Sequence, residues 1–264
     1  MLLRRITKHV KEQNWFAVVL DFAIVVIGVL FALMAEQWIR AGQQRADLKN
    51  AETAFTADLF TNLFSAKEVL ATAPCRVERT QILSELLEKD DVEWQGLPWT
   101  PHPGVFETQL PEVLPTPYRF WGSRAWEVEL SNGTLSTMDG ERRRALDTIF
   151  TGTSLMLEKQ EDIFEAQARL KVLAIPRKIS PRDRSKYLEL LHYHDLQSGL
   201  RERVARQTLP QIEAVNPQPN QAYFDEFREY MKTYTQERLE RYGDCFVPFE
   251  MPYLAIVTPD EITP

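Results

Sequence analysis

The residues WFAVVLDFAIVVIGVLFALMA, from Trp15 to Ala35, decide how this chain is organised. Every residue in the stretch except Asp21 is apolar. An α-helix rises about 1.5 Å per residue, so this stretch can cross a hydrocarbon core of about 30 Å. We therefore expect residues 15–35 to be a transmembrane helix; the rival interpretation is a cleaved signal peptide. The run exceeds the roughly 7–15 apolar residues of a signal peptide, and cleavage after Ala35 would put Leu33 where a small residue is required.

The charges and aromatics flanking this span predict its orientation. Four basic residues precede it: Arg4, Arg5, Lys8 and Lys11. The residues that follow it mix both signs, so the basic bias favours a cytoplasmic N-terminus. Trp15 and Trp38 bracket the span as interfacial aromatics do, and with Arg4 and Arg5 they are the expected interfacial anchors. We expect a single-pass protein of the bacterial inner membrane, with residues 1–14 in the cytoplasm and 36–264 in the periplasm.

One face of the predicted span differs from the others. At about 100° per residue, a narrow stripe collects small residues and one carboxyl: Ala17, Asp21, Gly28, Ala32 and Ala35. Small residues four positions apart let a second helix approach closely. An ionisable group inside a membrane is costly and usually faces protein or water. The stripe therefore predicts a helix–helix interface, with a proton-carrying Asp21 or an Asp21 hydrated at the cytoplasmic surface as alternatives.

The rest of the chain predicts an all-α fold, in which the transmembrane helix continues into a periplasmic helical bundle. Glycine is scarce, and apolar residues recur at helical spacing. Residues 36–73 read as a stalk-like helix ended by Pro74. Further helices are expected at Phe120–Leu130, Glu141–Leu173, from Ser180-Pro181 to about Thr208, and Gln221–Tyr242. Asp139, Ser180 and Asn220 are expected N-caps, and Gly243 is expected to end the last helix.

Two segments are expected to lack helix. Residues 96–118 hold six prolines with interleaved aromatic residues, so they predict a long loop. The loop either docks a partner or, in the interpretation that we favour, packs its aromatics onto the helices of its own domain. After Phe246 the tail is expected to form an extended strap around the apolar residues Tyr253–Val257.

The chain has two cysteines, Cys75 and Cys245. An oxidising periplasm permits a disulfide between them, which would close a loop of about 170 residues and tie the end of the stalk to the last helix. The alternative is two buried free thiols. Redox catalysis is not expected, because the chain has no Cys-x-x-Cys motif.

Composition and motifs favour binding over catalysis. The net charge is −7, and no basic block beyond the N-terminus indicates nucleic-acid binding. We find no phosphate-binding loop, no nucleophile elbow and no His-Glu-x-x-His motif. His192 and His194 point about 200° apart on a helix, so they do not predict a shared metal ion. We expect a non-enzymatic accessory subunit without cofactor or metal, whose partners are membrane lipid and other transmembrane helices.

The N-terminal sequence resembles a family of uncharacterised proteobacterial single-pass membrane proteins, which begin with a basic helix followed by an NW…LDF.I.V.GV span. The residues that carry the resemblance are Asn14, Trp15, Leu20, Asp21, Phe22, Val25, Val26, Gly28, Val29 and Trp38. A weaker similarity involves Trp126, Asn132, Gly133 and Leu135. The resemblance implies a membrane anchor with an outer helical domain and implies no activity.

A second, looser resemblance is to the proton-driven stator subunits of flagellar motors and of outer-membrane energising systems. They share a carboxyl early in a single span and a large outer domain, which would make Asp21 a proton carrier. This chain shows no peptidoglycan-binding pattern. A periplasmic ligand-binding module is the remaining alternative, and the 14 residues before the span are too few to form an output domain for it.

Overall fold

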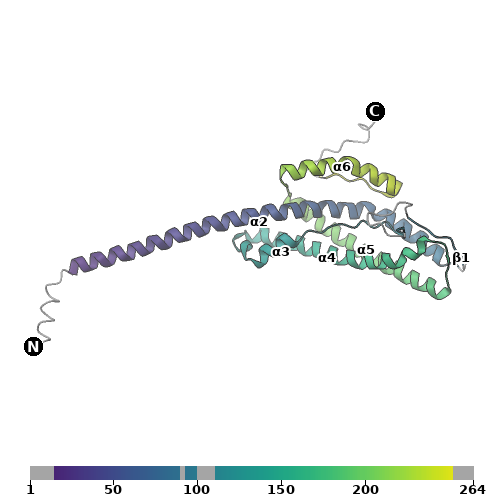
Figure 1. The fold of residues 1–264 in the computed structure, drawn as a ribbon, viewed down its shortest axis with the longest axis horizontal. Helices are drawn as coiled ribbons and strands as arrows, with labels where there is room; N and C mark the ends of the chain where they lie inside the picture. The colour runs from purple at the N-terminus through teal and green to yellow at the C-terminus, as the bar shows by residue number, and fades with distance from the viewer. Residues whose placement is uncertain (1–14, 90–92, 100–110, 252–264) are drawn as a thin grey trace, which may run out of the picture. The chain divides into compact units, whose positions relative to one another are not determined.

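The computed structural model describes residues 15–89, 93–99 and 111–251, with the side chains of 15–18 left out. It confirms the predicted all-α class (Figure 1). The described residues form five α-helices: α2 (Trp15–Leu87), α3 (Arg124–Ser131), α4 (Gly140–Leu170), α5 (Pro181–Val215) and α6 (Gln221–Tyr242). Short 3₁₀ turns follow at η1 (Thr134–Thr137), η2 (Lys171–Ala174) and η3 (Gly243–Cys245). Strands β1 (Glu93–Trp94) and β2 (Arg177–Lys178) form one small antiparallel pair.

The chain divides into two compact units, residues 1–50 and 51–264. Helix α2 contributes to both. In the first unit, the described residues are the N-terminal part of α2 alone. The second unit is a helical bundle built around the C-terminal part of α2, and it contains the buried core.

Two apolar clusters make up much of the core of the second unit. One joins the ends of α2 and α4, η2 and the first part of α5, and includes Leu83, Leu87, Leu170 and Leu191. The other joins the middle of α2, α4 and α5 around Trp121 and Met156. Phe60 and Phe64 on α2 instead meet α6, through Phe227 and other rings. In Figure 1, α6 lies on the opposite side of α2 from α3 and α4. Helix α2 is therefore the central element of the second unit.

Two predicted helix ends are wrong, that of the stalk-like helix at Pro74 and that of the helix from Pro181 at about Thr208, just before Pro210. Helix α2 continues through Pro74 to Leu87, and α5 continues through Pro210 to Val215. A proline inside a helix costs about 3 kcal/mol. Beyond Pro74, however, Leu83 and Leu87 are almost completely buried, and each such side chain contributes roughly 1.5–3 kcal/mol. Tertiary packing therefore outweighs the local penalty.

The predicted helix caps are confirmed. The Asp139 carboxylate accepts hydrogen bonds from the N–H groups of Glu141 and Arg142. The Ser180 hydroxyl accepts from the Asp183 N–H, with Pro181 in the first turn. Asn220 caps α6 in the same way through Tyr223. Gly243 follows α6 with a φ of 68°, a conformation that favours glycine.

The described parts of the two predicted non-helical segments form no α-helix. Residues 96–99 and 111–118 form no helix, while 100–110 and Tyr253–Val257 lie outside the described residues. Trp94 is buried and donates from Nε1 to the Leu173 carbonyl, and Trp99 lies 6.1 Å from the Tyr242 ring. These two aromatics therefore pack onto their own domain. The helix expected from Phe120 begins later, at Arg124, because Trp121 is drawn into the core by an extended segment.

Replacing Trp126 tests the core near the start of the bundle. Its ring is 3% exposed, stacks 5.1 Å from Phe150 and meets the edge of Phe55. We expect Trp126→Ala to lower the free energy of unfolding by about 3–5 kcal/mol, because the site cannot collapse around so large a cavity. Denaturant unfolding of the purified chain in neutral detergent measures the loss.

Phe120→Ala is the matched control for Trp126→Ala. Phe120 is 79% exposed, so its removal should change stability by about 0.5 kcal/mol or less. Equal losses for the two variants would contradict the packing described for α3 and α4.

Candidate functional site

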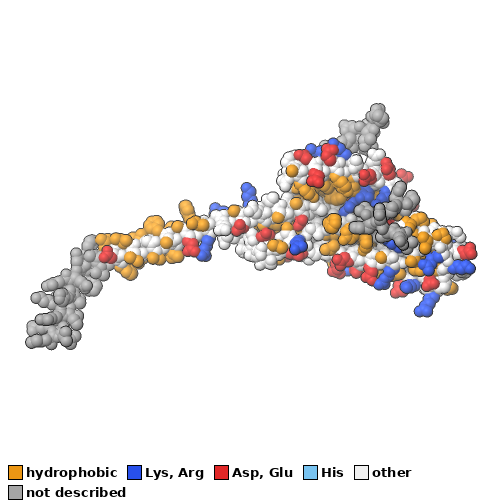
Figure 2. All heavy atoms as spheres, in the orientation of Figure 1, with side chains coloured by type: hydrophobic (Ala, Val, Ile, Leu, Met, Phe, Trp, Pro, Cys, Tyr) orange, Lys and Arg blue, Asp and Glu red, His pale blue; other side chains and the backbone are white. Residues whose placement is uncertain are grey.

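The N-terminal part of α2 is an apolar helix that no other described residue covers. Its large apolar side chains are exposed from Val19 onward, including Phe22 at 70% and Phe31 at 67%. Figure 2 shows these side chains along the helix. Among the described residues, α2 is the one helix that is long and apolar enough to cross a membrane. Exposed apolar surface on this scale is characteristic of a segment that meets lipid or another protein.

The stripe predicted from the sequence lies on this helix. Asp21, Gly28, Ala32 and Ala35 are exposed, and α2 continues without interruption through all of them. A Cβ added at Gly28 would meet no atom within 4 Å. Ala17 lies within α2, but its side chain is outside the description. The described part of the stripe is thus an exposed face of small residues with one carboxyl near its N-terminal end.

The expected interfacial anchors are placed only in part. Trp38 is 83% exposed, one turn beyond the apolar segment. Beside it, Arg40 forms an ion pair with Glu36 within the helix. Trp15 begins α2, but its side chain is outside the description, and Arg4 and Arg5 precede the described residues.

In the second unit, a buried carboxylate links three segments of the chain. Glu68 on α2 is fully buried and forms a bidentate ion pair with Arg119, which lies in the extended segment before α3. Tyr234 on α6 donates to the same carboxylate at 2.6 Å, and Arg238 pairs with it at 3.1 Å. Burial and the negative charge of Glu68 raise the pKa of Tyr234. Sequence reasoning missed Glu68, because one acid in a helix rich in Glu carries no distinguishing signal.

A second polar cluster joins α2 to α5. Arg76 donates from Nε to Glu202 at 2.8 Å and also pairs with Asp195. His194 is fully buried beside this pair, and its Nε2 lies 3.2 Å from the Thr116 hydroxyl. Burial, together with the nearby charges of Arg76 and Arg201, lowers the pKa of His194 to about 3. His194 is therefore neutral in the folded protein.

The expected disulfide between Cys75 and Cys245 is present in the structure. It joins α2, one residue after Pro74, to the last residue of η3, three residues beyond the end of α6. Two residues further on, the Val247 N–H donates to the Ala71 carbonyl at 3.0 Å. The extended chain after Cys245 is therefore fixed along α2 beside the proline.

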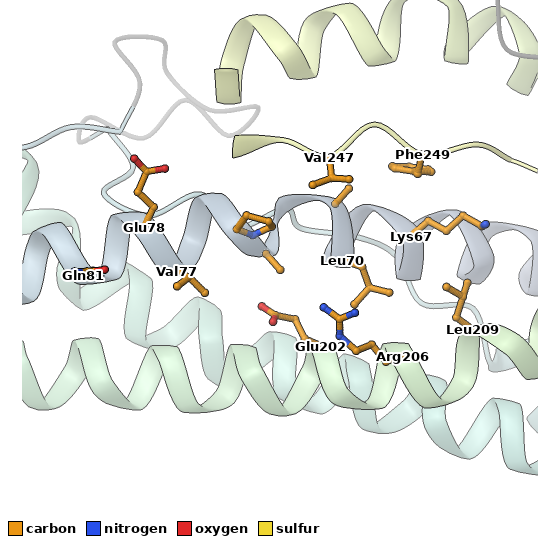
Figure 3. Close-up of a pocket in the computed structure, with 13 residues that line it drawn as sticks. Lys67, Leu70, Val77, Glu78, Gln81, Glu202, Arg206, Leu209, Val247 and Phe249 are labelled. Carbon is orange, nitrogen blue, oxygen red and sulfur yellow. The ribbon is translucent and has the colours of Figure 1, made fainter. Parts of the chain in front are cut away.

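That extended chain forms one wall of a groove (Figure 3). The groove has a volume of about 810 Å³ and lies between α2, α5 and Val247 with Phe249. Leu70, Val77 and Leu209 line it, and Arg206 and Glu202 point into it from α5. Its lining is mainly apolar and also includes the charged residues Lys67 and Glu78 of α2.

The two histidines considered as metal ligands face opposite ways. His194 is buried, while His192 is exposed. Within residues 15–89, 93–99 and 111–251, no group of three His, Cys, Asp or Glu side chains is arranged to hold a metal ion.

Comparison with protein-family models, with curated proteins and with solved structures gave no match.

The low pKa of His194 predicts an acid-sensitive fold. The unfolded chain binds a proton at this histidine near pH 6.5, whereas the folded chain binds it only near pH 3. Stability contributed by neutral His194 is therefore complete above about pH 6.5 and is lost as the pH falls toward 3, by roughly 1.4 kcal/mol per pH unit. We expect His194→Gln to flatten the pH dependence of unfolding between about pH 6 and 4, measured by urea titration relative to the unmodified chain.

His192→Gln is the control for this titration, because His192 is exposed two residues away on the same helix. It should leave the acid slope unchanged. An identical slope in the unmodified and His194→Gln chains would show that His194 is not buried as a neutral group.

Proposed function

We propose that this protein is a membrane-anchored, non-enzymatic interaction subunit that docks onto other transmembrane helices and presents its helical bundle outside the membrane. The observation that carries the proposal is the exposed apolar part of α2, from Val19 to Met34. Burying so much apolar surface in a bilayer is strongly favourable, whereas leaving it in water is not.

Two features support a bacterial inner-membrane location with the bundle in the periplasm. The basic residues before α2, among them Arg4 and Arg5, favour a cytoplasmic N-terminus. The Cys75–Cys245 disulfide fits an oxidising compartment for the second unit. The N-terminal resemblance to proteobacterial single-pass membrane proteins is consistent with the same arrangement.

The stripe on α2 is the proposed docking face. A helix in lipid gains nothing by exchanging lipid contacts for equally apolar protein contacts, so association depends on close packing and on polar groups. Gly28 and Ala32 supply the close approach, and Asp21 supplies a hydrogen-bonding group that lipid does not satisfy.

A binding role also fits the contacts of two buried charged residues, both of which have partners inside the second unit. Glu68 pairs with Arg119 and Tyr234, and Arg76 pairs with Glu202 and Asp195. These contacts hold helices together. Their partners are residues of the same domain, which is typical of a scaffold.

The proposal predicts that a partner co-purifies with the chain at fixed stoichiometry. We expect mild extraction from native membranes to recover a membrane complex, and Gly28→Leu with Ala32→Leu to abolish its recovery, because two bulky side chains keep the helices apart. Mass spectrometry of the purified complex measures both results. The control is Val26→Leu, which lies on the opposite face of the same helix and should leave recovery intact. Recovery of the chain without any other component would refute the proposed accessory role.

Asp21→Asn separates docking from proton transport. Asn keeps a hydrogen-bonding group but cannot carry a proton, so docking predicts that the complex and its cellular activity both survive. An intact complex that has lost its activity would instead support the stator-like alternative. The readouts are complex recovery and growth of a strain that depends on the protein.

A further inference from the structure

Both helices that line the groove do so with the residue spacing of a helix-packing surface. From α2 the lining includes residues at intervals of three and four, namely Lys67, Leu70, Pro74, Val77 and Gln81. From α5 the intervals are four and three, through Glu202, Arg206 and Leu209. This alternation keeps one line of side chains facing a neighbouring helix, as the a and d positions of a coiled coil do.

This surface is open within the described part of the chain. Val77 and Val247 are each 53% exposed, and Pro74 and Arg206 are exposed as well. Figure 3 shows Leu70 and Val77 pointing from α2 toward α5. Apolar side chains that line a common groove and stay open to solvent indicate a surface for another molecule.

The dimensions of the groove match one helix lying along it. Gln81 follows Lys67 by 14 residues of the same helix. At 1.5 Å per residue these residues span about 21 Å, and a helix about 10 Å wide and of that length, sunk to half its width, displaces about 800 Å³. The groove has a volume of about 810 Å³.

Two charged residues of the lining are available to a partner. Lys67 is already paired with Glu213 at 2.7 Å. Arg206 on α5 and Glu78 on α2 form no ion pair and no side-chain hydrogen bond with any other described residue. The groove therefore offers one unpaired charge of each sign beside its apolar lining, which complements an amphipathic helix that carries both signs on its flanks.

The wall opposite α5 is held in place by the domain itself. Cys245 is tied to α2 by its disulfide, and the Val247 N–H donates to the Ala71 carbonyl at 3.0 Å. The Phe249 ring lies 5.8 Å from that of Phe64. A groove formed in advance costs less ordering on binding than one that a partner must assemble.

We propose that the groove between α2 and α5 docks an amphipathic helix of a partner protein, with the apolar face of that helix on Leu70, Val77 and Leu209 and an acidic residue beside Arg206. The inference rests on the proposed interaction function. It assigns a docking site to the second unit, separate from the stripe on the N-terminal part of α2.

A designed helical peptide tests this site without knowledge of the natural partner. The probe is a fluorescent, hydrocarbon-stapled peptide with leucine at its a and d positions, glutamate along one flank and lysine along the other. We expect saturable binding to the full chain in lipid nanodiscs, measured by fluorescence anisotropy against empty nanodiscs. Val77→Asp should abolish binding, because it places a charge on the apolar lining. Phe120→Asp, at a residue that is 79% exposed and does not line the groove, should leave it unchanged.

A charge exchange tests the contact at Arg206. Arg206→Glu should weaken binding of the probe several-fold at physiological salt. A second peptide, with lysine on both flanks, should bind Arg206→Glu more tightly than it binds the unmodified chain, since the new carboxylate then faces a cation. Arg203→Glu is the matched control, because Arg203 is exposed on the same helix and does not line the groove. It should leave both affinities unchanged.

Three results would overturn the proposal. One is an absence of saturable binding, or binding that Val77→Asp leaves intact. Another is equal binding of a peptide of the same composition with central prolines, which would assign the groove to an extended segment. The third is lipid that native mass spectrometry finds on the unmodified chain and not on Val77→Asp, without peptide binding, which would assign it to an acyl chain. Recovery of the membrane complex tests the proposed function separately, so a failure here leaves that result standing.

Discussion

The carboxylate of Glu68 is the contact on which the arrangement of the second unit depends. It lies on the central helix α2, is closed off from water, and receives Arg119 from the segment before α3 and Tyr234 and Arg238 from α6. A carboxylate removed from water is stable only when its charge and its lone pairs are satisfied together. This requirement fixes where α6 and the segment before α3 meet α2. Apolar rings alone, such as Phe64 against Phe227, permit sliding between helices more readily than a charge with directional partners does.

The second unit therefore combines two kinds of core. Around Leu83 and Leu170 it is apolar and close-packed. Between α2 and α5 it is polar, with Arg76 and His194 buried and Glu202 half-buried at the helix contact. Polar contacts of this kind are weak evidence of stability, but they can select one helix register over others. This combination of an apolar and a polar core suits a domain that needs one defined outer surface more than it needs high stability. The proposed interaction role requires such a surface.

The sequence was sufficient to predict the all-α class, the apolar segment of α2, the caps at Asp139, Ser180 and Asn220, and the Cys75–Cys245 disulfide. Each of these depends on local chemistry or on a small set of candidates. The course of α2 through Pro74 was not predictable in the same way, because burial of Leu83 and Leu87 outweighs the proline penalty only in the folded bundle. The role of Glu68 was hidden for a related reason. Its partners are remote in sequence, and nothing near it distinguishes it from a solvent-exposed charge on a helix.

The position of the disulfide has a mechanical consequence. Cys75 lies on α2, and Cys245 lies 170 residues later, after α3, α4, α5 and α6 have been completed. A tensile load applied between the N-terminal part of α2 and the chain beyond Cys245 passes along α2 and across the sulfur–sulfur bond. The 170-residue segment between the two cysteines carries none of that load along its backbone. Within the bundle, the load is borne by α2 up to Cys75, whereas the backbones of α3, α4, α5 and α6 are bypassed.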